Sequence, residues 1–369
     1  MFDTLKEAAR WPSRALLSFP RVFLAFLAGS SAPTVLACAL SLLFVVFVTH
    51  GTCGSAESLA PHLAPPPPKL CYPPSVSLYW IAVSTCLWFV VATLPVHRIP
   101  LCFVPALARD RVLRQVADAR RTLAAADGEA DKKQREEAKE FLLAVRNRSV
   151  GFLNAVVVSL LSFACVTLDR KLIDDKFFGC SPLFAVTGFT LVGYFVWDFV
   201  VIVWNWSPGA PQWLLHCVVC IFTVANPFIV LPGEPPMSFY AASLILFELS
   251  TPFLALRYFM LRAYVFHPKS PEELCEQKDG RDGAPKLPLA YTFVSVAFAV
   301  VFFSVRIVWG LGWLIPSLAV AVWTGEGAFF RPWRRYLFYV SIPLFAALNL
   351  YWMYMIVASV LFSKRKKKD

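Results

Sequence analysis

Five ionisable side chains lie within long apolar stretches of the sequence, and they are the residues best suited to do chemistry. They are Asp198, His216, Glu248, Arg257 and Arg306. A charged group in hydrocarbon is costly, so it usually faces a cavity or a partner, and each one is a candidate functional residue. Histidine alone among them exchanges protons near neutral pH. The pattern indicates a buried polar site that recognises a polar ligand or, through His216, transfers a proton.

Asn349 is an uncharged companion of these residues in the last apolar stretch. No Ser/His/Asp order, Gly-rich phosphate loop or metal-ligand cluster rises above background, so we predict no metal and no cofactor. The CxxC at Cys217 and Cys220 is a weak signal, because it lies within an apolar stretch and has no second ligand pair. We also hypothesise a disulfide between Cys53 and Cys71 on the oxidising side.

The elements that position these residues follow from the composition. The 369 residues are 58% hydrophobic and only 16% charged, against roughly 25% charged residues in a soluble domain. The charges gather in a few segments and leave apolar runs of about 20 residues, the length of a membrane-spanning helix. We therefore predict an all-α polytopic membrane protein with about eight transmembrane helices. The expected spans are 31–49, 76–96, 150–168, 182–204, 212–231, 239–262, 289–312 and 337–361.

The seventh span has an ambiguous end. Apolar sequence continues from Leu289 to Trp323, interrupted by Arg306 and by glycine and proline residues. A ninth crossing is disfavoured, because the residues from Trp313 to Trp323 are too few to cross hydrocarbon. One helix followed by a short re-entrant segment is compatible with this pattern, and the sequence does not decide whether the segment forms.

Positive charge predicts the orientation of the helices. Most of the 35 Lys and Arg residues fall in segments that share a side with both termini. Cytosolic loops retain Lys and Arg, so both termini are predicted to face the cytosol. The net charge of +11 then reflects topology, and its dispersion among acidic residues argues against nucleic-acid binding. The glycosylation sequons at Asn147 and Asn205 become cytosolic and unmodified.

The last four residues of the sequence are Lys366-Lys367-Lys368-Asp369. They have two interpretations. Lysines three and four residues from the terminus look like a dilysine retrieval signal for the endoplasmic reticulum, which would make retrieval machinery a partner. A basic flank that only enforces topology explains the same residues equally well. Both alternatives agree with the predicted orientation.

Depth along the helices predicts which candidate residues meet. At about 1.5 Å per residue, Asp198 lies on the order of 9 Å from the cytosolic end of its span, and His216 and Arg257 lie roughly 6 Å from theirs. These three residues could converge in one pocket that opens to the cytosol. Glu248 lies deeper, with Arg306 as its expected partner. The alternative is that the charges only fix the register of neighbouring helices.

Six sequence segments carry a family resemblance, in the order in which the family has them. They are Arg146-Asn147-Arg148-Ser149-Val150, Gly193-Tyr194-Phe195-Val196-Trp197-Asp198, Leu215-His216-Cys217, Glu248-Leu249-Ser250-Thr251-Pro252-Phe253 with Arg257, Phe302-Phe303-Ser304-Val305-Arg306-Ile307, and Asn349-Leu350-Tyr351-Trp352. Through them the chain from about Lys139 to Val357 resembles the TLC-domain family, which includes the ceramide synthases, and looks closest to its small TLC-domain-containing branch.

The resemblance implies a domain organisation and selects the same five charged residues. Spans three to eight would form a six-helix bundle around a lipid-accessible chamber, where Asn349 joins the five. The implied parts are an N-terminal region with two transmembrane helices (1–105), a cytosolic charged helical segment (106–138), the TLC domain (139–361) and a basic cytosolic tail (362–369). The charged segment is expected to break at Asp127-Gly128.

Two departures from the ceramide synthases shape the functional hypotheses. The adjacent histidines of those enzymes read Leu215-His216 here, and Asn154 replaces a histidine of the first core helix. Our first hypothesis is a multi-pass protein of the endoplasmic reticulum that binds, senses or moves a membrane lipid in its chamber and takes part in lipid homeostasis. The sequence leaves a homo-oligomer open.

The alternative function is an acyltransferase of the ceramide-synthase type, with acyl-CoA as substrate. His216 would act as the base, Asp198 would orient it, and Arg257 would hold an anionic group. A histidine in that role usually needs an orienting partner. A transporter is the third hypothesis, and it is least favoured because the sequence shows no inverted repeat.

Overall fold

The computed structural model of the chain describes residues 72–125, 131–206, 210–230, 234–264, 288–323 and 330–363. All of them belong to one compact unit, Glu57–Asp369. Within these residues the secondary structure is helical throughout. The expected span at 31–49, the cysteines at 53 and 71 and the basic tail at 364–369 lie outside the described residues.

Seven of the described helices are long and apolar enough to cross a membrane, which confirms the prediction of an all-α polytopic membrane protein. They are Pro74–Thr93, Lys132–Thr167, Pro182–Trp204, Ala210–Phe228, Ser238–Tyr264, Leu289–Trp323 and Pro332–Ala358. Each overlaps one of the expected spans. The helix Lys132–Thr167 begins earlier than the expected span 150–168, because the charged sequence before that span continues the same helix. The last helix begins at Pro332 rather than at 337.

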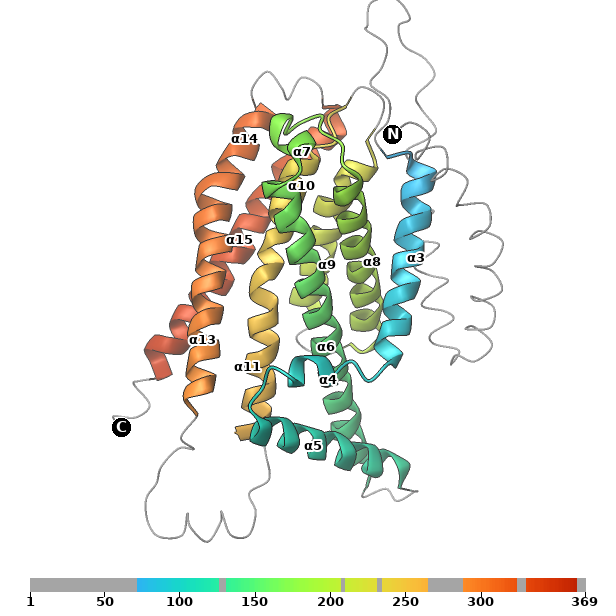
Figure 1. Ribbon diagram of the computed structural model, residues 1–369, viewed down its shortest axis with the longest axis vertical. Helices are drawn as coiled ribbons and strands as arrows, with labels where there is room; N and C mark the ends of the chain where they lie inside the picture. The colour runs from blue at the N-terminus through green and yellow to red at the C-terminus, as the bar shows by residue number, and fades with distance from the viewer. Residues whose placement is uncertain are drawn as a thin grey trace, which may run out of the picture. The chain divides into compact units, whose positions relative to one another are not determined.

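The elements follow one another as a series of membrane crossings (Figure 1). In chain order they are α3 (Pro74–Thr93), α4 (Arg98–Leu101), α5 (Ala106–Ala124), α6 (Asp131–Thr167), α7 (Arg170–Asp174), α8 (Pro182–Trp204), α9 (Ala210–Ala225), η1 (Asn226–Phe228), α10 (Ser238–Ile245), η2 (Leu246–Ser250), α11 (Thr251–Tyr264), α13 (Leu289–Phe302), η3 (Phe303–Leu314), α14 (Ile315–Trp323) and α15 (Pro332–Ser363). We call the two ends of the bundle the α5 side and the α7 side, after the short elements that lie there.

Helix α5 lies at one end of the bundle and packs against α6 and α11. Its apolar residues Val112 and Val116, one helical turn apart, are buried in a core with Phe259 and Met260 of α11. A helix with apolar residues at this spacing buries one face and leaves the other polar. The charged segment before the third span is therefore docked onto the transmembrane helices.

Helix α3 packs closely on α8 because of a glycine. A Cβ atom on Gly193 would approach the Cβ of Ser84 to 2.6 Å and the backbone nitrogen of Thr85 to 2.8 Å. Both distances are well below normal contact, so a larger residue would push α3 away. On the neighbouring turn the Trp88 indole donates a hydrogen bond of 3.0 Å to the Thr190 carbonyl. These contacts hold α3 against α8.

The crossing from α10 to α11 is interrupted at its centre by the 3₁₀ stretch η2. Pro252 lies just beyond it and lacks the amide hydrogen that would bond to the carbonyl of Glu248. The tighter turn leaves the Phe247 carbonyl available, where it accepts hydrogen bonds from Ser250 and from Arg306. The break thus exposes backbone acceptors in mid-membrane, which is tolerated only where other groups satisfy them.

The crossing from Leu289 to Trp323 is one continuous helix, so this stretch contains no re-entrant segment. Its middle part, η3, is a π-helix. A π-helical stretch widens the backbone spiral and often marks a functional site. Gly310 within it fits closely over the Phe247 ring, because a Cβ there would come within 2.3 Å of the ring. The widened turn precedes Pro316, which cannot join the normal α-helical hydrogen-bond ladder.

A buried ion pair joins the start of α15 to the preceding segments on the α7 side. Arg334 Nη1 lies 3.7 Å from Glu234 Oε2, and their side chains are 0% and 3% exposed. The Arg334 Nε also donates to the Asn226 side-chain oxygen at 2.9 Å. Both charges are loop residues by the sequence prediction, yet here they lie inside the protein.

Candidate functional site

A cavity of about 580 Å³ opens among α6, α8, α9, α11, α13 and α15. We call it the chamber. Five of the six candidate residues line it, namely Asp198, His216, Glu248, Arg257 and Arg306. They come from four different crossings, so the helix packing brings them to one place. Its apolar wall includes Ile202, Leu254 and Phe298.

Arg306 is the least exposed of the five candidate residues that line the chamber. The side chain is 5% exposed, and its Nη1 donates to the Asn349 side-chain oxygen at 3.2 Å. Its Nε donates to the Phe247 carbonyl, also at 3.2 Å. The guanidinium carbon lies 5.1 Å from the Phe302 ring centroid and 5.2 Å from that of Trp352. Neutral oxygens and aromatic faces thus hold the positive charge in place.

Asn349 belongs to this cluster but does not line the chamber. It is fully buried, and its amide nitrogen donates to the Phe345 carbonyl at 2.8 Å within α15. With its nitrogen so engaged, its oxygen faces Arg306. Asn349 therefore acts on the chamber by orienting Arg306.

The sequence prediction paired Glu248 with Arg306, and the structure does not form that pair. Among the described residues, Glu248 accepts a hydrogen bond of 2.9 Å from the Thr251 hydroxyl and makes no ion pair within 4.0 Å. Two of the five N–H donors of Arg306 are directed instead to the η2 carbonyl and to Asn349. Glu248 is 8% exposed, so its carboxylate remains a buried acceptor at the chamber wall.

The His216 ring lies edge-on between two aromatic rings. Its centroid is 5.6 Å from that of Phe195 and 5.1 Å from that of Trp352. Its Nδ1 lies 3.5 Å from the Cys220 sulfur, one turn along α9. Asp198, in turn, accepts a hydrogen bond of 3.3 Å from the Cys217 thiol. Within the described part of the chain no hydrogen bond joins Asp198 to His216, so the orienting contact of the acyltransferase hypothesis is not formed.

Two further arginines face the chamber on the α5 side. Arg257 lies over the Tyr291 ring at 5.8 Å. Arg148 lies between two aromatic rings, 5.5 Å from the Trp213 centroid and 5.6 Å from that of Tyr258. Neither arginine makes an ion pair with a described residue. Cation–π contacts hold a guanidinium without neutralising it, so both charges remain able to meet an anion.

Sequence reasoning missed Arg148 as a site residue, together with Tyr194, Trp213 and Trp352 of the lining. The motif order contained the signal, since Arg148, Tyr194 and Trp352 lie in three of its six segments. Asn154, by contrast, is fully buried on α6 and is absent from the chamber lining.

The chamber chemistry suits a ligand with both polar and apolar parts. Three guanidinium groups and two carboxylates surround its polar portion, while aliphatic and aromatic side chains form the remainder. Among the described residues, no group of three or more His, Cys, Asp or Glu side chains could hold a metal ion. The site offers hydrogen-bond donors, acceptors and apolar surface.

Bundle and chamber together define an integral multi-pass α-helical membrane protein with a buried polar site. The family profile of the TLC domain matches residues 144–358, which is more than half of the chain. The chain therefore belongs to the TLC-domain family, and the resemblance predicted from the six motif segments is confirmed. Membership makes a lipid-related function in the membrane the general expectation.

One relative is an uncharacterised TLC domain-containing protein of Schizosaccharomyces pombe. It is 24% identical to this chain over 212 residues. The aligned region covers 57% of this chain and 63% of the relative, so the match spans less than two thirds of the relative's length. No solved structure is significantly similar to the chain.

Proposed function

We propose that the chamber binds a polar membrane lipid, and that the protein thereby takes part in membrane lipid homeostasis. The observation that carries the proposal is the composition of the chamber wall. A cavity of about 580 Å³ combines Arg148, Arg257 and Arg306 with two carboxylates and an extended apolar surface. Ligand pockets typically have this form, with mostly apolar walls and a few placed polar groups that fix orientation.

The lipid headgroup is expected at the end nearest Arg148 and Arg257. Neither side chain makes an ion pair within 4.0 Å with a described carboxylate, and both lie toward the α5 side. Arg306 is less available, because it is 5% exposed and two of its donors bond to Phe247 and Asn349. The acyl chains would then extend along Leu254, Phe298 and the other apolar residues.

A steric block tests the proposal with a matched control on the next residue. Ile202 lines the chamber, whereas Val203 is 48% exposed on the outside of α8. The full chain and its Ile202→Trp and Val203→Trp variants would be purified in mild detergent. Lipids that remain bound after washing would then be quantified by mass spectrometry.

We expect Ile202→Trp to lose most of the retained lipid, because the indole fills the cavity, and Val203→Trp to keep it. Retention by Ile202→Trp at the level of the unmodified chain would refute a lipid in the chamber. So would an equal loss in both variants, since that loss would not depend on the cavity.

The acyltransferase alternative is less well supported, because Asp198 and His216 make contacts with two different cysteines rather than with each other. A direct assay would incubate the purified chain with a long-chain base and acyl-CoA, beside a His216→Ala variant. We expect no N-acyl product above the level without protein. Product whose formation requires His216 would overturn the non-catalytic proposal.

We further propose that the protein lies in the endoplasmic reticulum membrane with its α5 side toward the cytosol. Basic residues concentrate on that side, as cytosolic segments require. Cys180 on the α7 side is disulfide-bonded, which suits an oxidising lumen. The α5 side instead carries Cys102, a free and exposed thiol.

A membrane-impermeant maleimide added to intact microsomes would test this orientation. The label expected on Cys102 would be identified by mass spectrometry of its peptide, with Cys102→Ser as the control. Labelling that requires detergent permeabilisation, or a glycan on Asn147 or Asn205, would invert the topology.

A further inference from the structure

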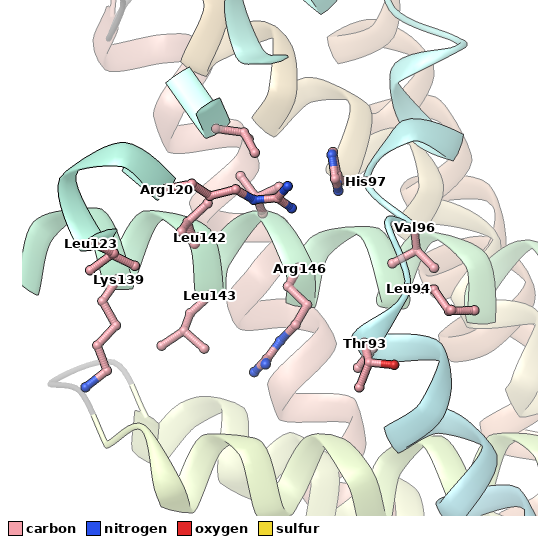
Figure 2. A pocket seen from close by; sticks show the side chains of 13 residues that line it. Thr93, Leu94, Val96, His97, Arg120, Leu123, Lys139, Leu142, Leu143 and Arg146 are labelled. Carbon is pink, nitrogen blue, oxygen red and sulfur yellow. The ribbon is translucent and has the colours of Figure 1, made fainter. Parts of the chain in front are cut away.

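A second pocket, of about 290 Å³, lies between the end of α3 and the helices α5 and α6 (Figure 2). It shares no lining residue with the chamber. Its wall on α6 includes Lys139, Leu143 and Arg146, which recur at helical spacing along one face. The chamber uses Ala144 and Arg148, on a different face of the same helix. The two cavities thus lie on either side of α6.

The side chains that line this second pocket are basic or neutral. Figure 2 shows Arg120 of α5, Lys139 and Arg146 of α6, and His97 beyond α3 around it. No Asp or Glu is among its lining residues. We call it the basic pocket. The ammonium of Lys139 is partly neutralised, because it lies 3.8 Å from a Glu136 oxygen.

The two guanidinium groups of the basic pocket are not neutralised. Arg120 is exposed and makes no ion pair or hydrogen bond with a described residue. Arg146 is half-buried, and its one hydrogen bond runs from Nε to the Asn147 side-chain oxygen at 3.4 Å. Two unpaired guanidinium groups from facing helices are a favourable arrangement for an anion, because arginine binds phosphate through two parallel N–H donors.

The half-buried imidazole of His97 reports the same positive surroundings. Burial lowers the pKa of His97 below its usual value, and the charges of Arg120 and Arg98 lower it further. Protonation is therefore opposed by neighbouring positive charge. An anion in the pocket would relieve that opposition.

The basic pocket lies at the level of the membrane surface. Its lining includes Thr93, the last residue of the transmembrane helix α3, and Leu94. Leu94, which lines the pocket, is 53% exposed. Leu107, at the start of α5, is also exposed. Exposed apolar side chains beside basic residues are typical of a segment in the headgroup layer.

We propose that the basic pocket binds the headgroup of an anionic phosphodiester lipid from the leaflet on the α5 side. Arg120 and Arg146 contact the phosphate oxygens, while Leu94 of the pocket wall lies against the upper part of the acyl chains. The volume suits this occupant, since about 290 Å³ is roughly ten times the 30 Å³ of a liquid water molecule. The adjacent apolar surface favours a lipid over a soluble phosphate, which would leave that surface unused.

Native mass spectrometry of the full chain in uncharged detergent tests the proposal. The probe is dioctanoyl phosphatidylglycerol, and phosphatidylcholine of the same chain length provides a zwitterionic comparison. Arg120→Gln and Arg146→Gln remove the two proposed contacts singly. The double variant Arg114→Gln/Lys132→Gln is the matched control, because it removes two exposed charges from the same helices outside the pocket.

We expect phosphatidylglycerol to bind more tightly than phosphatidylcholine, and each pocket variant to weaken that binding by about fivefold. The control variant should bind as the unmodified chain does. Equal weakening by the control would refute a localised site in favour of diffuse surface charge. Because Arg120 is exposed and unpaired, Arg120→Gln should fold normally, and unchanged binding by this variant alone would also overturn the proposal.

Two further measurements distinguish a lipid phosphate from a soluble phosphate, and the basic pocket from the chamber. Soluble glycerophosphoglycerol should compete only weakly, and competition as strong as that of the lipid would overturn the lipid assignment. The Ile202→Trp variant, which fills the chamber, should retain the phosphatidylglycerol preference. Loss of that preference in Ile202→Trp would assign the binding to the chamber instead.

Discussion

The buried pair of Glu234 and Arg334 gives a quantitative test of the packing on the α7 side. Glu234→Gln keeps the acceptor for the Arg331 amide, which Glu234 Oε1 now receives at 3.0 Å, and removes only the charge. It leaves Arg334 buried, with Asn226 as its remaining hydrogen-bond partner in the described part of the chain. Removing one partner of a buried pair costs about 3–5 kcal/mol.

The lower end of that range is expected here. The Arg334 Nη1 to Glu234 Oε2 separation of 3.7 Å is longer than a hydrogen bond, so the pair contributes Coulomb attraction without a direct donor contact. A loss of about 3 kcal/mol corresponds to a fall in the thermal midpoint on the order of 10 °C. Fluorescence-detected size-exclusion chromatography after heating would measure that midpoint in detergent.

A double-mutant cycle separates the pair from the other contacts of each residue. Arg334→Met should cost a similar amount, whereas Glu234→Gln/Arg334→Met should cost clearly less than the two single losses together, since it leaves no unpaired charge. The exposed pair of Lys133 and Glu137, at 4.0 Å, is the control, and Glu137→Gln should change stability by less than about 0.5 kcal/mol. Additive single losses, or a Glu234→Gln midpoint equal to that of the unmodified chain, would refute the reasoning.

Three further predictions follow from single residues. Asn154→Leu should stabilise the protein by about 1–2 kcal/mol, read as a higher midpoint, because both amide atoms of the buried Asn154 lack a partner among the described residues. Gly310→Ala should lower the stability by about 1–3 kcal/mol, because the added Cβ meets the Phe247 ring. Gly312→Ala should be nearly neutral, because a Cβ there meets only the Ile307 carbonyl at 3.6 Å. Similar thermal midpoints for both variants would contradict the close fit of Gly310. Phosphatidylglycerol binding should tighten as pH falls from about 7.5 to 5.5. A bound anion raises the lowered pKa of His97 toward its usual 6.5, so anion binding is linked to proton uptake. The groups facing His97 are Arg98, Arg120, Lys139 and Arg146, and a pH dependence that persists in His97→Gln would exclude this origin.

The energetic cost of burying charge in the membrane predicted which residues line the chamber, but it did not predict which partners they contact. The cost of burying a charge in hydrocarbon identified Asp198, His216 and Arg257 from sequence, and helix rise placed them at similar depth. The pairing of Glu248 with Arg306 was wrong, because the sequence does not reveal that η2 offers a backbone carbonyl to the guanidinium. Contacts with backbone groups depend on local helix geometry, which hydropathy does not report.

The fold was predictable at the level of crossings and less so within them. An apolar run has the same hydropathy whether its turns are α, 3₁₀ or π, so the π-helical stretch η3 was invisible and its glycines suggested a re-entrant segment instead. Arg334 and Glu234 lie among loop residues in the sequence, where charges are ordinary. The basic pocket depends on how α3, α5 and α6 pack together, and only the three-dimensional arrangement brings Arg120 and Arg146 together.

Helix α6 is a shared partition between the two cavities. The same helix carries Arg146 on one face and Arg148 on another, so a rotation of α6 about its axis moves both side chains together. A rotation that seats Arg146 more deeply in the basic pocket must also shift Arg148 relative to Trp213. If both proposed ligands bind, a ligand that fixes the rotation of α6 about its axis would change the shape of the opposite cavity, and linkage requires that any such coupling be reciprocal.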